Sequence, residues 1–591
     1  MFAALFNSDG RPIDPRPLGA AGHDVEVLGS ARRVAFVCTK VDPALSEIGA
    51  CGIQNLDGRH WIVGRIRLDA RDDLRARPAD RVGSGPDGLT DAQLCLHAYA
   101  AWGDGFLDRL AGDFCFVLWD SARDRLVCAR DQLGVRSLFH AEAGGAWFVA
   151  DSLDWIATST PVSRDLDDAW VADFLSVGHC LEFERTVYRR IRRLAPAHVL
   201  TLTDSGADLR RYWRLDIAEP LYYSDRRRYF EQLVDLLLKS TRDRLPAGKV
   251  GISMSGGLDS TTLAAFAVQA TGDPSRVVAE CGYLERLMPD DEHHFSALVA
   301  RKLGIELQLR PIDDLDYDPQ WRSRSIRTAE PTTSILSAYH DRAIGREQAG
   351  RAQVWFEGEG PDNALPFERN AYLSWLVGRR DWRRLGEAVL QYVAAKGLSG
   401  WMATLRRYAR RRAEPDDSFD IPPWLDRSLV GRLDLEGRLE GKGAAAAPPH
   451  PWHPRAFASF NDPIWAAVFT DHDLEETLAP LVWRHPFLDL RVLEFMLSVP
   501  PVPWGREKLL LREAMRGRLP PEVLARKKVS FPALPVADLL RTGGLPGLPP
   551  GGRLGEYVDV RALPAGPASG NDLDRVLAVH VLDHWLAQRI P

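Results

Sequence analysis

The residues best suited to chemistry in this sequence form the hexapeptide at positions 255–260. Its members are Ser255, Gly256, Gly257, Leu258, Asp259 and Ser260. Glycines let the backbone turn tightly, so that successive N–H groups point into one concavity, and the serine hydroxyls add donors. Such a loop is suited to binding phosphate. Asp259 would repel a bare phosphate, and we therefore expect it to hold Mg²⁺ on that phosphate.

The surroundings of the hexapeptide support this interpretation. It lies between the apolar run Val250–Met254 and the stretch Thr261–Ala270, whose apolar residues have helical spacing. A Gly-Gly pair at such a turn is by itself weak evidence, but the whole hexapeptide is far more specific. It lacks the GK[ST] ending of a Walker loop and is not GxGxxG. It resembles the pyrophosphate loop of ATP-pyrophosphatase enzymes, which cleave ATP between the α and β phosphates and form adenylates.

The elements that must position this loop change in character near Ser224. Before it, short strands with turn signals predominate, for example Val34–Thr39 and Phe114–Asp120. After it, strand-like and helical runs alternate, which predicts a parallel α/β sheet. The expected elements are a helix at Arg228–Arg244, a strand at Val250–Met254, a helix at Thr261–Ala270, a strand at Val277–Gly282 and a helix at His293–Leu303.

Composition excludes several classes of protein. A chain of 591 residues is too long for one core and predicts roughly two to four domains. A net charge of -6 gives no general reason to expect nucleic acid, and no apolar run reaches membrane-spanning length. The seven cysteines are scattered singly, without a CxxC pair, and the first residues lack the basic region of a signal peptide. We therefore expect reduced, mostly buried thiols in a cytoplasmic protein, with neither a nucleic acid nor a membrane as partner.

Three further motifs follow the hexapeptide in order, and together they resemble the asparagine synthetase superfamily. They are Gly358-Glu359-Gly360-Pro361-Asp362, Arg484-His485-Pro486-Phe487-Leu488-Asp489, and a basic region that runs from Lys508–Arg512 to Arg526-Lys527-Lys528. The resemblance implies an ATP-pyrophosphatase domain, of the adenine nucleotide alpha hydrolase-like fold, at residues 222–591. An insertion is expected at about 366–455, because the low-complexity stretch Gly441–Pro451 falls there.

The first half of the chain resembles the class II glutaminase domain of the same superfamily. The resemblance is carried by Leu110–Asp120, Ala129–Arg136, Ile191–Leu200 and Arg211–Trp213. It implies an Ntn-hydrolase-like αββα sandwich at residues 1–215. A working glutaminase of this class has a cysteine directly after the initiator Met, whereas this chain has Phe2. Its Asn-Gly oxyanion element aligns with Val63-Gly64, so a side-chain donor is missing as well. Asp91 matches a substrate-binding acid, but the sequence predicts a degenerate glutaminase.

A synthetase without ammonia from glutamine must use another amine. The stretch Gly358–Leu365 resembles the signature loop of lasso peptide cyclases, which join the N-terminal amine of a peptide to an Asp or Glu side chain. β-Lactam synthetases have tyrosine where this chain has Glu359. Val63–Asp69 also resembles the cyclase branch. The expected partner is a precursor peptide, and a leader-removing protease is a further candidate. The alternatives are a β-lactam synthetase-like enzyme, an ammonia-dependent asparagine synthetase, and a degenerate scaffold, which the intact loops argue against.

The family resemblance implies a role for each motif residue. ATP and Mg²⁺ are the expected cofactors, with Asp259 and Asp362 as metal ligands and with Gly358 and Lys508 beside the pyrophosphate. Glu359 is expected to accept the proton of the attacking amine or to orient that amine, and the alternative is a structural acid bonded to backbone amides. Lys528 is expected to stabilise charge on the adenylate phosphate and the oxyanion, with the adjacent Lys527 as an alternative.

Other suggestive residues are assigned structural roles. Asp290–His294 lacks the HExxH spacing of a metal site and begins a predicted helix. The acids at 313–318 are expected to form a solvated turn, and the arginines at 406–412 a solvated helix face. Trp375, Trp382 and Trp401 fall in the insertion, where they could line a peptide cleft.

Overall fold

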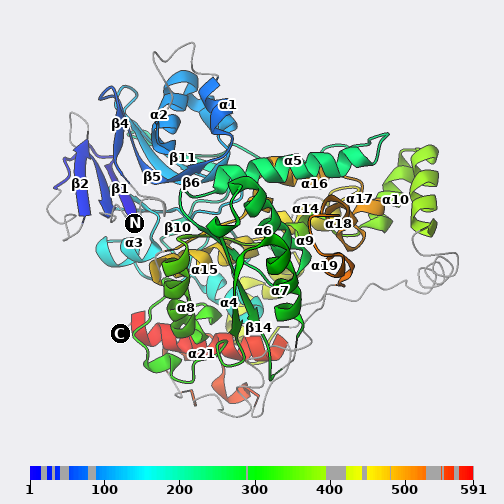
Figure 1. The fold of residues 1–591 in the computed structure, drawn as a ribbon. Coiled ribbons are helices and arrows are strands. Elements are labelled where there is room, and N and C mark those ends of the chain that lie inside the picture. The colour runs from blue at the N-terminus through cyan, green and yellow to red at the C-terminus, as the bar shows by residue number, and fades with distance from the viewer. Residues whose placement is uncertain are drawn as a thin grey trace.

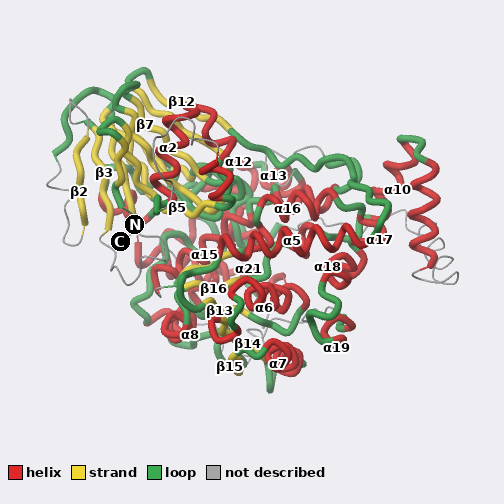
Figure 2. Tube along the Cα trace, turned by 45° about the horizontal axis from the view of Figure 1, so that its top comes forward, coloured by secondary structure: helices red, strands yellow, loops and turns green. Residues whose placement is uncertain are grey.

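The computed structural model describes residues 1–14, 23–28, 33–39, 52–76, 88–287, 290–394, 421–441, 449–478, 481–527, 547–548, 552–564 and 571–589. Lys528, Trp401 and the arginines at 406–412, to which the sequence assigns roles, lie outside these ranges. Within them the strands form three sheets, two antiparallel sheets before residue 212 and one parallel sheet from Val250 onward. In Figure 2 the antiparallel strands gather on one side of the molecule, with most helices on the other.

The first domain contains the two antiparallel sheets, each with six described strands. One has the order β10-β8-β9-β1-β3-β2 and the other β12-β11-β7-β6-β5-β4. The strands are β1 (Phe2–Asn7), β2 (His23–Leu28), β3 (Val34–Thr39), β4 (Gln54–Leu56), β5 (His60–Leu68), β6 (Gly112–Asp120), β7 (Arg125–Arg130), β8 (Phe139–Ala143), β9 (Ala146–Ala150), β10 (Arg192–Arg193), β11 (His198–Thr203) and β12 (Gly206–Arg211).

Strand β6 shows why these sheets stack between helices. Cys115, Val117 and Trp119 belong to the apolar layer between the two sheets. The alternate residues Phe114, Phe116 and Leu118 pack with α2 (Asp91–Trp102) on the outer face, because successive side chains of a strand point to opposite faces. Helices α3 (Leu153–Ser159) and α4 (Asp168–Val177) cover the outer face of the other sheet. The layers are therefore αββα, which confirms the predicted sandwich.

The second domain is built on a parallel sheet of five described strands, as predicted. Its order is β15-β14-β13-β16-β17, and every pair is parallel. The strands are β13 (Val250–Ser253), β14 (Val277–Tyr283), β15 (Glu306–Pro311), β16 (Val354–Phe356) and β17 (Val482–Arg484). Val354 and Phe356 face one apolar cluster and Trp355 the other, so both faces of the sheet are buried.

Helices cover the two faces of the parallel sheet. On one side lie α5 (Arg227–Arg244), α6 (Leu258–Thr271), α7 (Glu292–Leu303), α16 (Leu490–Ser498) and α18 (Leu509–Ala514), whereas α8 (Ala338–Arg351) packs on the other. The start of α6 differs from the sequence prediction: the helix begins at Leu258, inside the hexapeptide, because Gly257 is its N-cap residue. Figure 1 shows α5 lying between the strands of the first domain and α6.

The end of the chain returns to the first domain. Helix α21 (Asn571–Arg589) contacts α4, and Trp585 and Leu582 share one apolar cluster with Trp170. The remaining described helices are α1 (Arg71–Ala76), α9 (Pro361–Ala364), α10 (Arg369–Gly378), α12 (Arg427–Leu433), α13 (Leu435–Glu440), α14 (Pro454–Phe460), α15 (Ile464–Leu478), α17 (Pro501–Trp504) and α19 (Pro521–Ala525). Short 3₁₀ turns join several of them; η3 (Gly103–Arg109) follows α2. No helix among the described residues has both the length and the apolar character needed to cross a membrane.

One expectation about the cysteines is wrong. Cys38 is disulfide-bonded in the structure, so the thiols are not all reduced. The free described cysteines, Cys95, Cys115, Cys128, Cys180 and Cys281, are buried as expected. Burial raises the pKa of Cys281 to about 11, which keeps that sulfur a thiol rather than a reactive thiolate.

Candidate active site

The sheet order of the second domain creates a crevice beside β13 and β16. Strands β14 and β15 lie on one side of this pair and β17 on the other, so the chain winds outward in both directions from it. Loops that leave the carboxyl ends of two such strands diverge, and ligands of open α/β sheets bind in the gap between them. The hexapeptide follows β13, and Gly358–Asp362 follows β16. The two leading sequence motifs therefore meet at this point.

The hexapeptide turns in the way its glycines allow. Gly256 has a φ of +65°, and a Cβ there would lie 2.8 Å from the carbonyl oxygen of Glu292. The amide of Ser255 donates to the hydroxyl of Ser260 at 3.2 Å, which closes the turn. Because Gly257 has no side chain to cap α6, the first amide groups of that helix remain available to an anion.

The second loop packs directly on the first. A Cβ on Gly358 would lie 3.2 Å from the amide nitrogen of Ser260 and 3.3 Å from Cβ of Asp259. Gly360, with a φ of +123°, lies against Phe487 of the third motif. The glycines on either side of Glu359 thus permit a close approach that any other residue would obstruct. Glu359 itself is half-buried between them.

Lys508 joins the two loops. Its ammonium group lies 2.8 Å from Asp362 and forms a second ion pair with Asp259. Lys508 and Glu507 both have left-handed backbone conformations, with φ of 54° and 49°, immediately before α18. The carboxylates of the two predicted metal ligands therefore converge, and in this structure both pair with the ammonium group of Lys508. Two carboxylates with added phosphate oxygens are a donor set that suits Mg²⁺.

The basic motif near the end of the domain approaches the same turn. Arg526 donates two hydrogen bonds to Glu292, at 2.8 and 2.9 Å, and its guanidinium lies over the ring of Phe295. Gly256 packs against both Glu292 and Phe295, so Arg526 lies beside the hexapeptide. Lys527 is exposed, and the position of Lys528 lies outside the described residues. Sequence reasoning assigned Glu292 only to a helix start, and it did not find this ion pair.

The residues interpreted as structural have hydrogen bonds typical of turns. Asp290 accepts the amide hydrogens of Leu284 and Glu292. Asp313 accepts those of Glu285, Arg286 and Leu287, and it is buried rather than solvated as expected. Hydrogen bonds to these backbone groups keep the pKa of Asp313 below its usual value although burial opposes ionisation.

A second group of acids has the spacing of a metal site but is filled by arginines. Oxygens of Asp69, Asp243 and Asp489 lie within 4.8 Å of one another. Arg244 binds Asp69 and Asp489, each at 2.7 Å, and Arg491 binds Asp489 and Asp243, each at 2.6 Å. Nothing in the sequence linked these residues, because their partners are up to 248 positions apart.

In the first domain, the region aligned with the glutaminase nucleophile is apolar core. Phe2 is fully buried and shares a cluster with Val63 between the two sheets. The amide of Phe2 donates to Asp151 at 2.7 Å, and Arg65 pairs with the same carboxylate at 2.8 Å. Asp91, aligned with a substrate-binding acid, instead accepts the amide hydrogen of Leu68 and pairs with Arg71. Burial raises the pKa of Asp91 in spite of Arg71.

An αββα sandwich followed by a parallel sheet with a phosphate-type loop defines a two-domain enzyme. Residues 45–213 match the model of the glutamine amidotransferase domain, and residues 232–548 match the model of asparagine synthase. The chain belongs to the asparagine synthase family. It therefore carries an ATP-dependent amide-forming ligase domain. The boundaries predicted at 215 and 222, and the insertion at about 366–455, remain predictions.

The similarity to three curated relatives extends over most of this chain and most of each relative. Asparagine synthetase [glutamine-hydrolyzing] 3 of Bacillus subtilis is 23% identical over 78% of this chain and 73% of its own length. A putative asparagine synthetase of Mycobacterium tuberculosis is 29% identical over 81% and 74%. A protein named Amidase chyE, of Penicillium rubens, is 25% identical over 75% and 73%.

Proposed function

We propose that this protein is a macrolactam synthetase of lasso peptide biosynthesis. It activates an Asp or Glu side chain of a precursor peptide as an adenylate and joins it to the N-terminal amine of the same peptide. One observation carries the proposal: the synthetase loops meet at Lys508, whereas the aligned glutaminase nucleophile position is filled by Phe2. The amine must therefore come from a source other than glutamine.

The first step makes the carboxylate reactive. A carboxylate oxygen forms a bond to the α-phosphorus of ATP as the bond between the α-phosphorus and the bridging oxygen breaks, and pyrophosphate leaves with the electron pair. The amide groups at the start of α6 and the ammonium of Lys508 would bind the departing pyrophosphate, and their positive charge beside the hexapeptide supports this role. Asp259 and Asp362 would hold Mg²⁺, which supplies positive charge against the departing phosphates.

The second step forms the amide. The amine nitrogen bonds to the acyl carbon, the carbon–oxygen bond to the phosphate breaks, and AMP leaves. Glu359 accepts the proton that the nitrogen must lose, a role suited to a half-buried carboxylate beside the phosphate loop. Lys528, or the adjacent Lys527, would stabilise the oxyanion and the adenylate phosphate. Arg526, which is anchored to Glu292 beside the hexapeptide, supports this assignment.

The decisive experiment supplies candidate core peptides, free aspartate with ammonium, and small β-amino acids to the purified protein with ATP. We expect the protein to release AMP and pyrophosphate only when a core peptide is present. The peptide product should then be lighter than the substrate by the mass of one water. The resemblance of Gly358–Leu365 to lasso cyclase loops supports this expectation. Pyrophosphate release with aspartate and ammonium alone would refute it.

Two relatives are named glutamine-hydrolysing asparagine synthetases, and these names favour one alternative product, asparagine. With Phe2 at the expected nucleophile position, free ammonia would have to supply the nitrogen in that case. The same experiment separates the two, because only the peptide reaction yields a cyclic product. We further propose a cytoplasmic location, where ATP is supplied, and a leader-removing protease as a working partner.

A further inference from the structure

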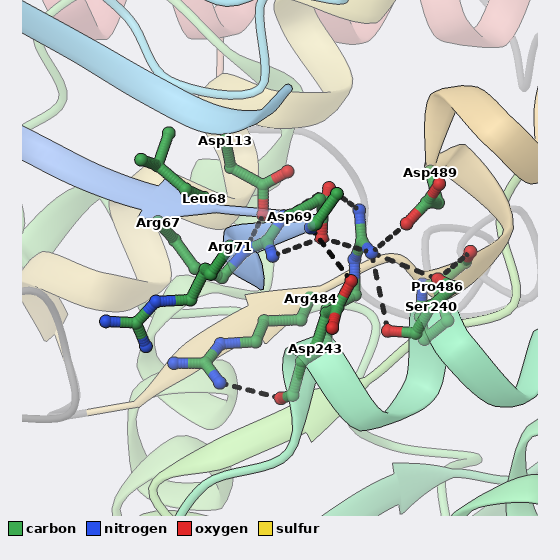
Figure 3. Close-up of polar contacts among 12 residues, drawn as sticks. Arg67, Leu68, Asp69, Arg71, Asp113, Ser240, Asp243, Arg484, Pro486 and Asp489 are labelled. Carbon is green, nitrogen blue, oxygen red and sulfur yellow. Dashed lines mark hydrogen bonds and ion pairs between the residues drawn. The ribbon is translucent and has the colours of Figure 1, made fainter. Parts of the chain in front are cut away.

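A chain of alternating charges, buried at its centre, joins the first domain to the second. It runs Asp113–Arg67–Asp69 in the first domain and continues Arg244–Asp489–Arg491–Asp243 in the second. The side chains of Asp69, Arg244 and Asp489 are 3, 1 and 1% exposed. In Figure 3 the labelled Asp69, Asp489 and Ser240 come together from three different segments of the chain.

Two neighbouring residues of the first domain, Asp69 and Ala70, bond to the end of α5 in the second domain. Arg244 donates to both carboxylate oxygens of Asp69, at 2.7 and 2.8 Å. The next residue of the first domain, Ala70, donates its amide hydrogen to Asp243 at 3.0 Å. The chain of charges therefore closes into a ring around the end of α5. A planar guanidinium that binds a carboxylate through two parallel bonds fixes direction as well as distance.

The ring depends on each of its members. Burial opposes the charged form of Asp489, but Arg244 and Arg491 outweigh it and hold the pKa of Asp489 well below its usual value. Arg67 has the same effect on the pKa of the buried Asp113. Loss of the charge on Asp69 would leave the buried guanidinium of Arg244 without its partner from the first domain, so Arg244 must move. Loss of the charge on Asp113 leaves Arg67 paired with Asp69 and does not touch Arg244.

The end of α5 is in turn bonded to the synthetase site. The carbonyl oxygen of Arg244 accepts a hydrogen bond from Arg484 at 2.6 Å, and Ser240 donates to the carbonyl oxygen of Pro486 at 2.7 Å. The carbonyl oxygen of Arg484 then accepts the amide hydrogen of Glu357 at 3.2 Å. Glu357 begins the loop that carries Glu359 and Asp362.

We propose that Asp69 of the first domain is a positioning residue for the synthetase loop 357–362, acting through Arg244 and Arg484. The first domain, with no nucleophile at the aligned position, contributes to the reaction by holding this loop against the hexapeptide. The proposal rests on the proposed function only in giving that loop a part in the reaction, and the order of the loop can be measured without any substrate.

The test measures amide hydrogen exchange of the full-length protein by mass spectrometry, comparing residues 354–365 with the reference strand β14. Asp69→Asn keeps the shape of the side chain and removes its charge. We expect exchange in 354–365 to become about tenfold faster, whereas β14 changes by less than about twofold. The matched control is Asp113→Asn, which removes a buried carboxylate from the same network but leaves both bonds between Asp69 and Arg244.

Arg484→Gln provides an independent arm, because it breaks the second link without altering the first domain. It should loosen the same segment, and in the double variant the two effects should not add, since both act on one connection. If Asp69→Asn fails to fold, Arg484→Gln decides alone. Unchanged exchange in 354–365, or equal loosening by Asp113→Asn, overturns the proposal.

Pyrophosphate release in the presence of peptide gives the functional reading. Asp69→Asn should lower kcat by about tenfold and leave KM for ATP within about twofold, because the hexapeptide is untouched. If no peptide is a substrate but the exchange pattern holds, the proposed function fails and the positioning role stands. If peptides cyclise but hydrogen exchange in 354–365 is unchanged, the proposed function stands and the positioning role of Asp69 fails.

Discussion

Removal of the charge on Lys508 should separate its part in the reaction from its part in stability. Lys508→Met keeps a chain of similar length and removes the ammonium that faces Asp259 and Asp362. Loss of one charged donor aimed at a developing anion costs about 2.7–4 kcal/mol, which is a rate loss of roughly 10²–10³. We expect kcat for pyrophosphate release to fall by that factor.

The cost to folding should be smaller. Asp362 is 48% exposed, so its ion pair with Lys508 contributes at most about 1 kcal/mol. Asp259 is 17% exposed, and a hydrogen bond to a charged group of this kind is worth about 1.5–3 kcal/mol. A protein with a free energy of unfolding of about 5–15 kcal/mol stays folded after such a loss. The lost rate then reports on the site rather than on unfolding.

The assay is ATP–pyrophosphate exchange with saturating peptide at 25 °C, together with a thermal unfolding curve. The matched control is Lys239→Met, which removes an exposed lysine paired with Asp235 at 2.8 Å and should leave the rate unchanged. The reasoning fails if Lys508→Met exchanges as fast as the unaltered protein. A faster variant would show instead that Lys508 competes with Mg²⁺ for the two carboxylates.

Three other predictions follow from the same site. Asp259→Asn and Asp362→Asn should each nearly abolish adenylation, and near-normal rates with Mg²⁺ in either variant would exclude that residue as a ligand. ATP should yield AMP and pyrophosphate, with activity lost in EDTA and restored by Mg²⁺; coupled ADP and phosphate would contradict the mechanism. Glutamine should release no glutamate, even in Phe2→Cys, because Val63 supplies no side-chain donor and a missing donor costs about 3–4 kcal/mol; a glutaminase assay on both proteins measures this.

Local sequence patterns were enough to predict the core of the site. The hexapeptide, with an apolar strand before it and a helix after it, fixes its own turn chemistry, and the alternation of strands and helices fixes the parallel sheet that places it. Asp259 and Asp362 were assigned to one site by the family resemblance, and in the structure both pair with Lys508. The start of α6 was misplaced, because Gly257 could be interpreted equally well as a loop residue or as an N-cap residue.

Interactions between distant segments could not be predicted in the same way. Arg244 looked like an ordinary basic residue at a helix end, where a favourable interaction with the helix dipole is sufficient explanation. Its role depends on Asp69 and Asp489, which are 175 and 245 positions away. Lys508 was assigned to pyrophosphate by resemblance alone, and its link to both acidic residues needed the left-handed backbone that precedes α18.

The proposed role of Asp69 gives the first domain a task that needs no glutaminase chemistry. Phe2 fills the space between the two sheets with an apolar side chain and leaves no buried charge there. Replacement of Asp69 by an uncharged residue would instead be costly, since the buried guanidinium of Arg244 would lose one of its two carboxylate partners. We propose that the first domain serves the synthetase reaction through the loop that it holds in place.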